Sequence, residues 1–316
     1  WFARTVALQS PVTAMRTSIS FVDSITEVLD TLLAGGTLVV FDKMTLLDHQ
    51  LFARRAAEYR ITNLMVVPAL LNHLLEVAPA ALASLQTVIT SGERLPPELL
   101  QRLASSFPAI RLFNTYGCSE VNGDATACEC RVGSDAVARS VIGRPIDHAT
   151  VYILDSQRQL VPQGAVGEIY IGGAGVAEGY INRAELSLER FVPDLFGDKR
   201  NARLYKTGDL GRLLPDGTIE YLGRNDFQVK MRGFRIELGE IEATLKTHPR
   251  VKDCVVMARE ERQGDPRLAA YLVARDSART ADSAVNAVNA AEALAEAGDA
   301  GFSLFYFGAT SGEEQH

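Results

Sequence analysis

The spacing of hydrophobic and polar positions changes along the chain. From about residue 24 to residue 110, short apolar runs alternate with longer segments in which apolar residues recur at helical spacing. The expected strands are 37–41, 61–67, 85–92 and 110–117. The expected helices are 24–36, 48–60, 69–78 and 96–107. This alternation predicts an α/β fold, with a mainly parallel sheet and helices on its faces, in which ligands bind beyond the carboxyl ends of the strands.

The pattern becomes rich in strands from about residue 140 to residue 224. Short strand-like runs separated by Gly, Pro and Asp turns lie at 151–155, 167–173, 204–209 and 218–223. We therefore expect 1–224 to belong to a large subdomain, with 140–224 as its smaller β-rich part. A helix at 237–248 and strands at 254–260 and 267–276 predict that 225–275 begins a second, α+β subdomain.

Composition narrows the class of protein. The 316 residues are 47% hydrophobic, so the chain can bury a substantial core as two domains or as a piece of something larger. The net charge of −7 is spread among interspersed acidic and basic residues, which leaves no broad cationic surface for nucleic acid or anionic lipid. No apolar run approaches the roughly 20 residues of a membrane span, and no signal peptide opens the chain. We expect a cytoplasmic protein without nucleic-acid or membrane partners.

The four cysteines form no CxxC pair and no disulfide-rich pattern. They are Cys118, Cys128, Cys130 and Cys254. This usage suits a reducing compartment. The spacing of Cys128 and Cys130 is wrong for a zinc knuckle, so we interpret the pair as structural.

The stretch from 205 to 242 carries the most informative chemistry. Asp209 follows Gly208, a residue that lets the backbone turn sharply and a ligand approach closely. Asp216-Gly217 predicts a tight hairpin turn between two strand-like runs. The short Gly/Asp break at 223–226 separates two ordered units and is a candidate hinge.

Three segments together resemble the signature motifs of the adenylate-forming enzymes, and in particular the amino-acid-activating adenylation domains of nonribosomal peptide synthetases. They are YKTGDL at 205–210, GRNDFQVKMRGFRIELGEIE at 223–242 and NTYGCSE at 114–120. The resemblance implies ATP-dependent activation of an amino acid as aminoacyl-AMP, with Mg²⁺. It also implies transfer of the aminoacyl group to the phosphopantetheine thiol of a peptidyl carrier protein, beside adjoining synthetase domains.

The resemblance assigns roles to individual residues. Ser119 and Glu120 would be catalytic, Ser119 bonding the α-phosphate and Glu120 holding Mg²⁺. In this loop Cys118 replaces the usual proline and Ser119 the usual threonine. The implied nucleotide-binding residues are Gly92, Glu93, Asn114, Tyr116, Gly117, Asp209 and Arg224. Of these, Tyr116 would pack on adenine, while Asp209 would accept bonds from both ribose hydroxyls. Asp226 would be the hinge of a mobile subdomain, with Lys230 in the strand that follows.

The substrate pocket departs from the family pattern at one position. The family normally has an Asp directly after Phe21, where it pairs the α-ammonium, but here Val22 precedes Asp23. The implied pocket positions are Val22, Asp23, Thr26, Met65, Ile89, Ser91, Thr115, Gly123 and Asp124. A buried ammonium needs a paired carboxylate, and a carboxylate one residue along suits a β-amino group. The set resembles pockets that select β-alanine or a related β-amino acid.

Other interpretations of the pocket and of the chain remain open. Asp23 could instead cap a helix at 24–34, and Asp124 could be a solvated loop residue, in which case the substrate could lack an amino group. The rival enzymes are acyl-CoA ligases and aryl or fatty acyl-AMP ligases. A further alternative is a catalytically silent scaffold.

The two ends of the chain suggest an excised fragment of a longer protein. We expect the family's phosphate loop upstream of Trp1 and its terminal lysine downstream of Leu272, so that the α+β subdomain is truncated. Residues 276–301 form an Ala-rich, linker-like segment. The run FSLFYFG then resembles the opening strand of luciferase-like flavin monooxygenase domains, so 302–316 would begin an inserted, flavin-binding domain. The alternative is a C-terminal strand of the same domain.

Overall fold

The computed structural model describes residues 5–6, 10–77, 79–130, 139–197, 202–226, 228–231, 234–262, 265–275 and 302–307. The chain divides into two compact units, Trp1–Asp226 and Phe227–His316. The predicted linker at 276–301 lies outside the described residues, as do 308–316. None of the helices in the described ranges is both long enough and apolar enough to cross a membrane.

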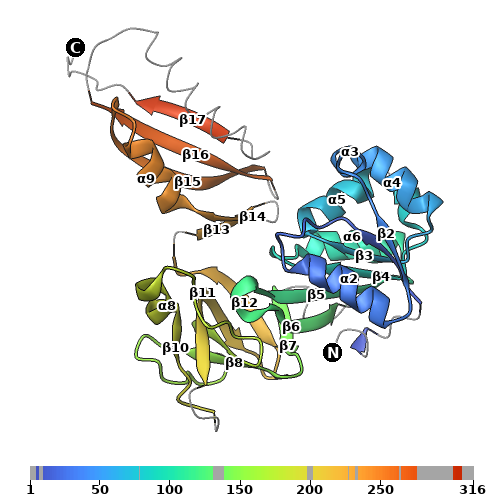
Figure 1. Ribbon diagram of the computed structural model, residues 1–316, viewed down its shortest axis with the longest axis horizontal. Coiled ribbons are helices and arrows are strands. Elements are labelled where there is room, and N and C mark those ends of the chain that lie inside the picture. The colour runs from blue at the N-terminus through green and yellow to red at the C-terminus, as the bar shows by residue number, and fades with distance from the viewer. Residues whose placement is uncertain are drawn as a thin grey trace. The chain divides into compact units, whose positions relative to one another are not determined.

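One half of the larger unit is the predicted parallel sheet with helices (Figure 1). Its strands run in the order β2-β1-β3-β4-β5, all parallel. These strands are β1 (Val12–Met15), β2 (Thr37–Val40), β3 (Asn63–Val66), β4 (Thr87–Thr90) and β5 (Arg111–Cys118). The helical segments between them are α2 (Asp23–Leu33), α3 (Lys43–Leu47), α4 (His49–Glu58), α5 (Pro68–Val77), η1 (Pro79–Leu82) and α6 (Pro97–Ser106). The predicted fold class is confirmed, although the sequence pattern missed the short β1 and α3 in this half.

Alternation along the strands separates the two faces of this sheet. Leu64 and Val88 belong to the core that α5 and α6 cover with buried leucines and α4 with buried Phe and Ala side chains. Met65, Ile89 and Phe113 are the neighbouring residues and form a separate buried cluster. Because side chains alternate along a strand, this second cluster lies on the opposite face. By the same alternation, Thr115 on β5 and Ser91, just beyond β4, lie on the face of this second cluster.

The other half of the larger unit is antiparallel. It continues the same sheet in the order β5-β6-β7-β12-β11-β9-β8, with β10 paired to β11. Its elements are η2 (Ser119–Val121), β6 (Gly123–Cys130), β7 (Val141–Pro145), β8 (Ala149–Leu154), β9 (Gly167–Gly173), α8 (Ala184–Arg190), β10 (Phe191–Pro193), β11 (Arg203–Leu213) and β12 (Ile219–Arg224). Asp216 accepts from the backbone N–H of Thr218 at 2.9 Å between β11 and β12, as the predicted hairpin turn requires.

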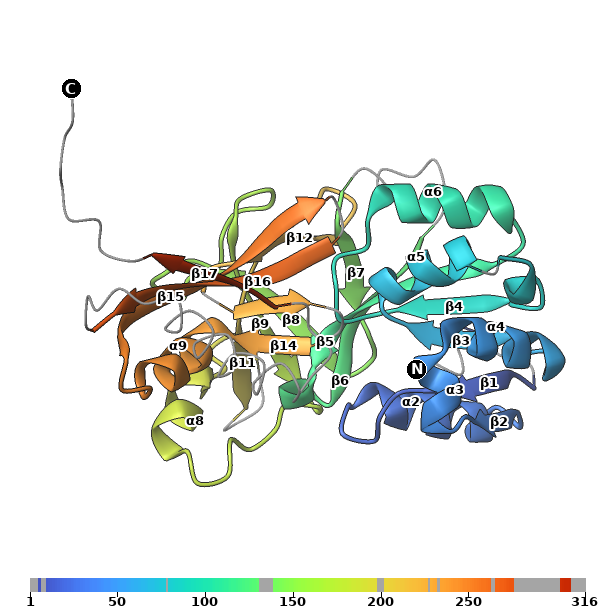
Figure 2. The same cartoon turned by 90° about the horizontal axis from the view of Figure 1, so that it is seen from above.

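This antiparallel part curls around its own core (Figure 2). Strands β5 and β11 are four steps apart in the sheet, which in a flat sheet would separate them by about 19 Å. However, the hydroxyl of Tyr116 on β5 lies 2.7 Å from the carboxylate of Asp209 on β11. The sheet must therefore bend back on itself. The enclosed core includes Ile142, Ile169 and Ile219.

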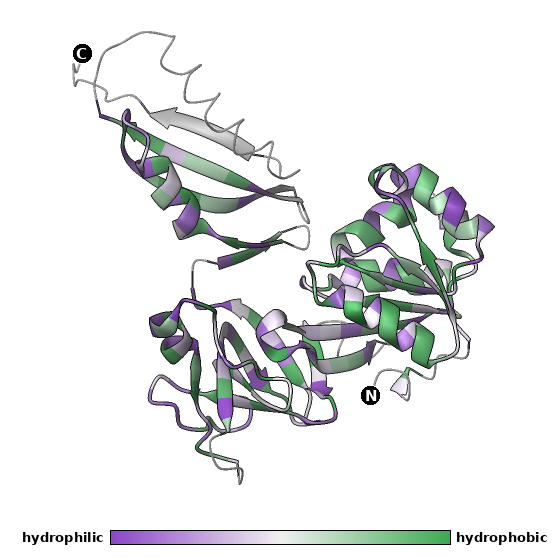
Figure 3. Ribbon diagram, viewed as in Figure 1, coloured by the Kyte–Doolittle hydropathy of each residue, from purple (hydrophilic) through white to green (hydrophobic). Residues whose placement is uncertain are grey.

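The smaller unit has its own core of α9 packed on strands. Hydrophobic and polar residues alternate around α9 (Figure 3), and its buried Leu238 and Leu245 join Val256 and Leu272 in that core. The elements are β13 (Gln228–Met231), β14 (Phe234–Glu237), α9 (Leu238–Lys246), β15 (Val251–Arg262), β16 (Asp265–Ala274) and β17 (Phe302–Phe307). Strand β17 pairs in parallel with β16. That pairing is the arrangement expected if FSLFYF is a strand of the same domain, while an inserted domain stays a prediction.

Substitution of Gly117 tests how closely the backbones of β5 and β6 approach each other. A Cβ atom at this position would lie 1.8 Å from the carbonyl oxygen of Gly123, on rigid backbone. We expect Gly117→Ala to lower the free energy of unfolding by at least about 2 kcal/mol in urea denaturation. The matched control is Gly239→Ala in α9, where a Cβ meets nothing within 4 Å. Equal stability of the two variants would contradict this packing.

Candidate functional site

Asp209 is a buried carboxylate with three side-chain donors. It is only 3% exposed. Tyr116 donates to its Oδ2 at 2.7 Å, Arg224 to its Oδ1 at 2.7 Å, and Tyr221 to the same oxygen at 3.4 Å. The backbone N–H of Asp209 donates to Thr207 Oγ1 at 3.0 Å. A carboxylate has about four acceptor positions, and these bonds fix the orientation of Asp209.

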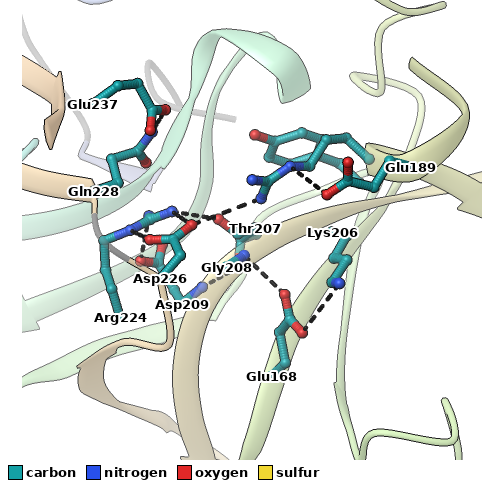
Figure 4. A network of polar contacts seen from close by, with 12 residues as sticks. Glu168, Glu189, Lys206, Thr207, Gly208, Asp209, Arg224, Asp226, Gln228 and Glu237 are labelled. Atoms are coloured by element: carbon teal, nitrogen blue, oxygen red, sulfur yellow. Dashed lines mark hydrogen bonds and ion pairs between the residues drawn. The ribbon is translucent and has the colours of Figure 1, made fainter. Parts of the chain in front are cut away.

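Arg224 joins Asp209 to the candidate hinge residue (Figure 4). Its Nε and Nη2 each lie 2.7 Å from an oxygen of Asp226, a bidentate pair, while Nη1 contacts Asp209. Gly208 has φ +76°, and a Cβ there would lie 2.6 Å from Asp226 and 2.7 Å from Arg224. Only glycine therefore fits beside Arg224 and its two carboxylate partners, which we call the Arg224 clamp. The sequence predicted this role for Gly208, because a glycine before Asp209 lets the backbone turn sharply. Arg190 Nη1 lies 3.8 Å from Asp226 Oδ2, which Arg224 also contacts.

The aromatic and amide side chains of the NTYG segment are both buried. Tyr116 is 6% exposed, and burial, followed by the charge of Asp209, raises its pKa well above the usual value. Its ring centroid lies 6.1 Å from that of Tyr221. Asn114 is 5% exposed and donates to the carbonyl oxygen of Val141 at 3.0 Å. Stacking of Tyr116 on adenine and bonding of Asn114 to its edge stay predictions.

The other predicted nucleotide residues lie at the ends of β4 and β5. Gly92 follows β4 with φ +79°. Glu93 accepts from the first-turn N–H of Ala69 in α5 at 3.2 Å. Gly117 stands at the bulge where β5 and β6 change register. Strand ends in such a sheet are where ligands bind, so these positions agree with the expected location of the site.

Glu120 is fixed by two tyrosines to which the sequence assigned no role. The hydroxyls of Tyr180 and Tyr205 donate to the same oxygen, Oε1, at 2.8 and 3.0 Å. Ser119 is exposed at the start of η2, directly before Glu120. Tyr205 is the first residue of the YKTGDL motif, and this position in a recognised motif is the signal from which a role for Tyr205 could have been predicted.

The donor set around Glu120 fits the expected Mg²⁺. In the described ranges, no group of three or more His, Cys, Asp or Glu side chains could hold a metal ion without other ligands. Mg²⁺ is usually bound through one or two carboxylates together with substrate phosphates, so a single oriented carboxylate suits it.

Asp23 does not cap a helix, and its role in a substrate pocket stays a prediction. Helix α2 begins at Asp23 itself, its N-cap is Val22, and no side chain bonds the first-turn N–H groups. Instead, Ser91 donates its hydroxyl to Asp23 Oδ2 at 2.6 Å. The alternative that Asp23 is an N-cap is therefore wrong, because a residue 68 positions away binds its carboxylate.

Asp124 lies close enough to Asp23 for the two charges to interact. It lies in β6 and is half-buried, so the alternative of a solvated loop residue is wrong. Burial raises its pKa to about 7, and the negative charges of Asp23 and Asp30 act in the same direction, while a hydrogen bond from Thr115 opposes them. The sequence pattern missed Asp30, which lies seven residues after Asp23 and hence on the same face of α2.

The other predicted pocket positions lie on or beside α2, β3, β4 and β6. Met65 and Ile89 are register partners on β3 and β4, and both are buried. Gly123 has φ +97°, and a Cβ there would lie 3.3 Å from Val22, so the glycine leaves room beside that side chain. Thr26 is half-buried one turn along α2 from Val22. Six of the nine predicted pocket residues are linked by these contacts: Val22, Asp23, Ser91, Thr115, Gly123 and Asp124.

The candidate hinge residues lie on either side of the boundary between the units. Asp226 is the last residue of the larger unit, held by Arg224. Lys230 is in β13 of the smaller unit, where its backbone pairs with Arg235. Rotation about this boundary stays a prediction.

The fold and these sites define the class of protein. The model of the AMP-binding enzyme family matches residues 2–181, and the chain belongs to this family. It is 48% identical over 263 residues to a linear gramicidin synthase protein of Brevibacillus parabrevis, an alignment that covers 83% of this chain and 5% of that protein. It is 43% identical over 262 residues to phosphinothricin tripeptide synthetase PhsB of Streptomyces viridochromogenes, covering 83% of this chain and 22% of that protein.

Solved structures agree. The chain matches PA1221, a nonribosomal peptide synthetase protein containing adenylation and PCP domains, with a TM-score of 0.77 and 27% identity, over 88% of this chain and 48% of that one. It also matches a four-domain nonribosomal peptide synthetase bound to AMP and glycine, with a TM-score of 0.64 and 33% identity, over 87% and 20% of the two chains. The predicted resemblance to adenylation domains is confirmed. The chain spans half or less of each of these proteins.

The Arg224 clamp should contribute strongly to stability. The side chains of Arg224 and Asp209 are only 8% and 4% exposed, and removal of one partner leaves the other charge buried and unpaired. We expect Arg224→Ala to lower the free energy of unfolding by about 3–5 kcal/mol in urea denaturation. The control is Arg55→Ala, which breaks the exposed pair with Glu58 and should cost less than about 1 kcal/mol. Similar losses in both variants would refute a buried clamp.

The raised pKa of Asp124 makes stability depend on pH. Its pKa is about 7 in the folded protein and close to 3.9 when unfolded, so the folded state holds the proton more tightly. This group's stabilising contribution is present below about pH 4 and is lost as the pH rises to about 7. We expect Asp124→Asn to become progressively more stable relative to the parent protein between pH 4.5 and 7.5, as measured by urea denaturation.

The control for this pH series is another Asp→Asn substitution. Bonds from Thr218 lower the pKa of Asp216. The stability difference between Asp216→Asn and the parent should therefore be constant across that pH range. A constant difference for Asp124→Asn as well would contradict the raised pKa.

Proposed function

We propose that this chain is part of an adenylation domain that activates a β-amino acid with ATP and passes it to a carrier-protein thiol. The observation that carries the proposal is the buried bond between Tyr116 and Asp209, which joins two motif segments 93 residues apart. It brings the candidate adenine residue and the candidate ribose carboxylate within one hydrogen bond of each other. Membership of the AMP-binding enzyme family supports the same nucleotide.

Asp209 would accept the ribose hydroxyls, for which Tyr116 and Arg224 hold its carboxylate in place. Pre-orientation of this kind lowers the entropic cost of binding. The exposed Ser119 hydroxyl would donate to the α-phosphate, where negative charge develops as the substrate carboxylate attacks and pyrophosphate leaves. Glu120, oriented by Tyr180 and Tyr205, would hold Mg²⁺, which would neutralise part of the phosphate charge.

A β-amino acid, such as β-alanine, is the proposed substrate because of where Asp23 lies. An ammonium group in a half-buried pocket needs a carboxylate partner, and Val22 occupies the position before Asp23. One residue along a helix turns the side chain by about 100° as well as moving it about 1.5 Å along the axis, so the carboxylate reaches a different point. An amine one carbon further from the reacting carboxyl also occupies a different point, which a β-amino acid provides. The polar pocket disfavours an aryl or fatty acyl substrate.

The second half-reaction would be transfer of the aminoacyl group to the phosphopantetheine thiol of a carrier protein. The relation to proteins that contain adenylation and PCP domains supports it. The boundary after Asp226 supports a change of domain arrangement between the two steps.

The test is ATP–pyrophosphate exchange by the complete module that contains this chain. We expect exchange with β-alanine or another β-amino acid, in a panel that also holds α-amino acids and aryl acids. Asp23→Asn should lower kcat/KM by at least about 100-fold, because the substrate ammonium then lacks a charged partner. Glu98→Gln, an exposed carboxylate change on α6, is the matched control.

The outcomes separate the competing functions. Exchange confined to α-amino acids would reject the pocket argument but keep adenylation, and exchange only with aryl or fatty acids would support the rival ligases. Lack of exchange with any acid would favour a silent scaffold. Val22→Asp combined with Asp23→Ala returns the carboxylate to its usual family position and should shift preference towards α-amino acids. Loading of a carrier protein, followed as a mass increase, tests the thioester step.

A further inference from the structure

Strand β11 contains a β-bulge where it pairs with β9. The ladder is regular up to Lys206 and resumes at Leu210, and between these residues three positions of β11 lie opposite Ile169 alone. The bulged residues are 207–209. Bulges interrupt the ladder of backbone hydrogen bonds, and they often lie beside active sites, where they change the direction of a side chain. Here the last bulged residue is Asp209, the candidate ribose carboxylate.

Glu168 on β9 binds the central residue of this bulge through its side chain. The backbone N–H of Gly208 donates to Glu168 Oε1 at 3.0 Å (Figure 4). The Glu168 side chain is 12% exposed, and its Oε2 lies 4.0 Å from Lys206 Nζ. The φ of Gly208 is +76°, so the backbone leaves the strand conformation here and its N–H takes a side-chain partner in place of the ladder.

Other polar groups of the bulge are bonded from both neighbouring strands. Thr207 Oγ1 donates to the carbonyl oxygen of Ile169 on β9 at 2.7 Å and accepts from the N–H of Asp209 at 3.0 Å. Strand β12 lies on the other edge of β11, and its last residue, Arg224, donates to the carbonyl oxygen of Thr207 at 3.1 Å. Strand β9 therefore holds the bulge at two successive residues, through the Ile169 carbonyl and the Glu168 carboxylate.

We propose that Glu168 is a positioning residue for ribose recognition, because its bond to the Gly208 N–H fixes the bulge from which Asp209 reaches the ribose hydroxyls. Tyr116 and Arg224 orient the carboxylate itself, whereas Glu168 fixes the backbone that carries it. Glu168 acts through Asp209 and not on the nucleotide directly. This inference rests on the proposed adenylation function, in which Asp209 accepts those hydroxyls.

Two conservative substitutions separate the hydrogen bond of Glu168 from its negative charge. Glu168→Gln keeps a carbonyl oxygen at the same reach, so it can still accept from Gly208, but it removes the charge near Lys206. Glu168→Asp keeps the charge and shortens the side chain by about 1.5 Å, the length of one carbon–carbon bond. That loss of reach places the carboxylate oxygens beyond hydrogen-bond distance of the Gly208 N–H.

The experiment measures the dissociation constants of ATP and of 2′,3′-dideoxy-ATP for the complete module by equilibrium dialysis. The second nucleotide lacks both ribose hydroxyls, so the parent module should bind it more weakly than ATP. We expect Glu168→Asp to weaken ATP binding about tenfold, as for the loss of about one hydrogen bond, and to leave dideoxy-ATP binding unchanged. Glu168→Gln should keep both dissociation constants within about twofold of the parent values.

The matched control is Glu129→Asp on β6. It shortens another strand carboxylate by the same amount, one that pairs with Arg111 at 2.9 Å. This variant should change neither dissociation constant.

The other outcomes overturn the proposal at separate steps. Equal weakening of both nucleotides by Glu168→Asp would show a general loss of structure and refute a positioning role. Unchanged ATP binding by Glu168→Asp, or weakened ATP binding by Glu168→Gln, would refute the importance of the bond to Gly208. In these cases a parent module that prefers ATP to dideoxy-ATP leaves the proposed function standing. A parent that bound the two nucleotides equally, or bound neither, would instead refute the ribose role of Asp209, and the role of Glu168 with it.

Discussion

The burial of the Asp209 carboxylate constrains the whole larger unit. A charged group that is 3% exposed is stable only if its hydrogen-bond acceptors are satisfied, and the partners come from β5 and β12 as well as from β11 itself. The sheet can bring these strands together only by curling, which encloses the second core between them. Ionic and apolar contributions to the stability of this sheet therefore depend on each other, because the same curl buries the isoleucines and brings Tyr116 within hydrogen-bonding distance of Asp209.

The same constraint connects the candidate nucleotide site to the boundary between the units. Arg224 contacts Asp209 with one nitrogen and Asp226 with two others, so the side chain that orients the Asp209 carboxylate also fixes the last residue of the larger unit. The glycine at 208 is required by that arrangement, because any side chain would displace the clamp. A shift of Asp226 at the boundary would therefore move Arg224 and change the contacts of the Asp209 carboxylate. A ligand bound to Asp209 would affect Asp226 through the same side chain.

The sequence was informative where local pattern and tertiary packing agree. Helix α6 lies within one residue of its predicted bounds, because its buried leucines recur at helical spacing and Pro97 favours its first turn. Strand β6, GDATACEC, has no apolar alternation and was missed, since it is a strand through its pairing with β5 and β7. Helix α8 buries no residue, so its sequence has no amphipathic pattern that could predict it.

The site residues also differ in how well the local sequence predicts them. The motif segments identified Asp209 and Arg224, but for Asp23 the local sequence is equally compatible with a helix cap and a pocket carboxylate. Only the position of Ser91, 68 residues later, distinguishes the two.

The two candidate sites therefore differ in how strongly the fold specifies them. Asp209, the candidate nucleotide carboxylate, is tied to buried strands by short hydrogen bonds, so most substitutions there should perturb folding as well as any binding. The pocket carboxylates are half-buried, one at a helix end and one on a strand, and a burial-raised pKa shows that charge on Asp124 is already disfavoured. Substitutions that change the charge of these half-buried residues should cost little stability, whereas a change of charge at the buried Asp209 should cost much more. This difference gives a physical reason why Asp23, the candidate substrate-binding carboxylate, can stand one residue from its usual family position while YKTGDL is retained.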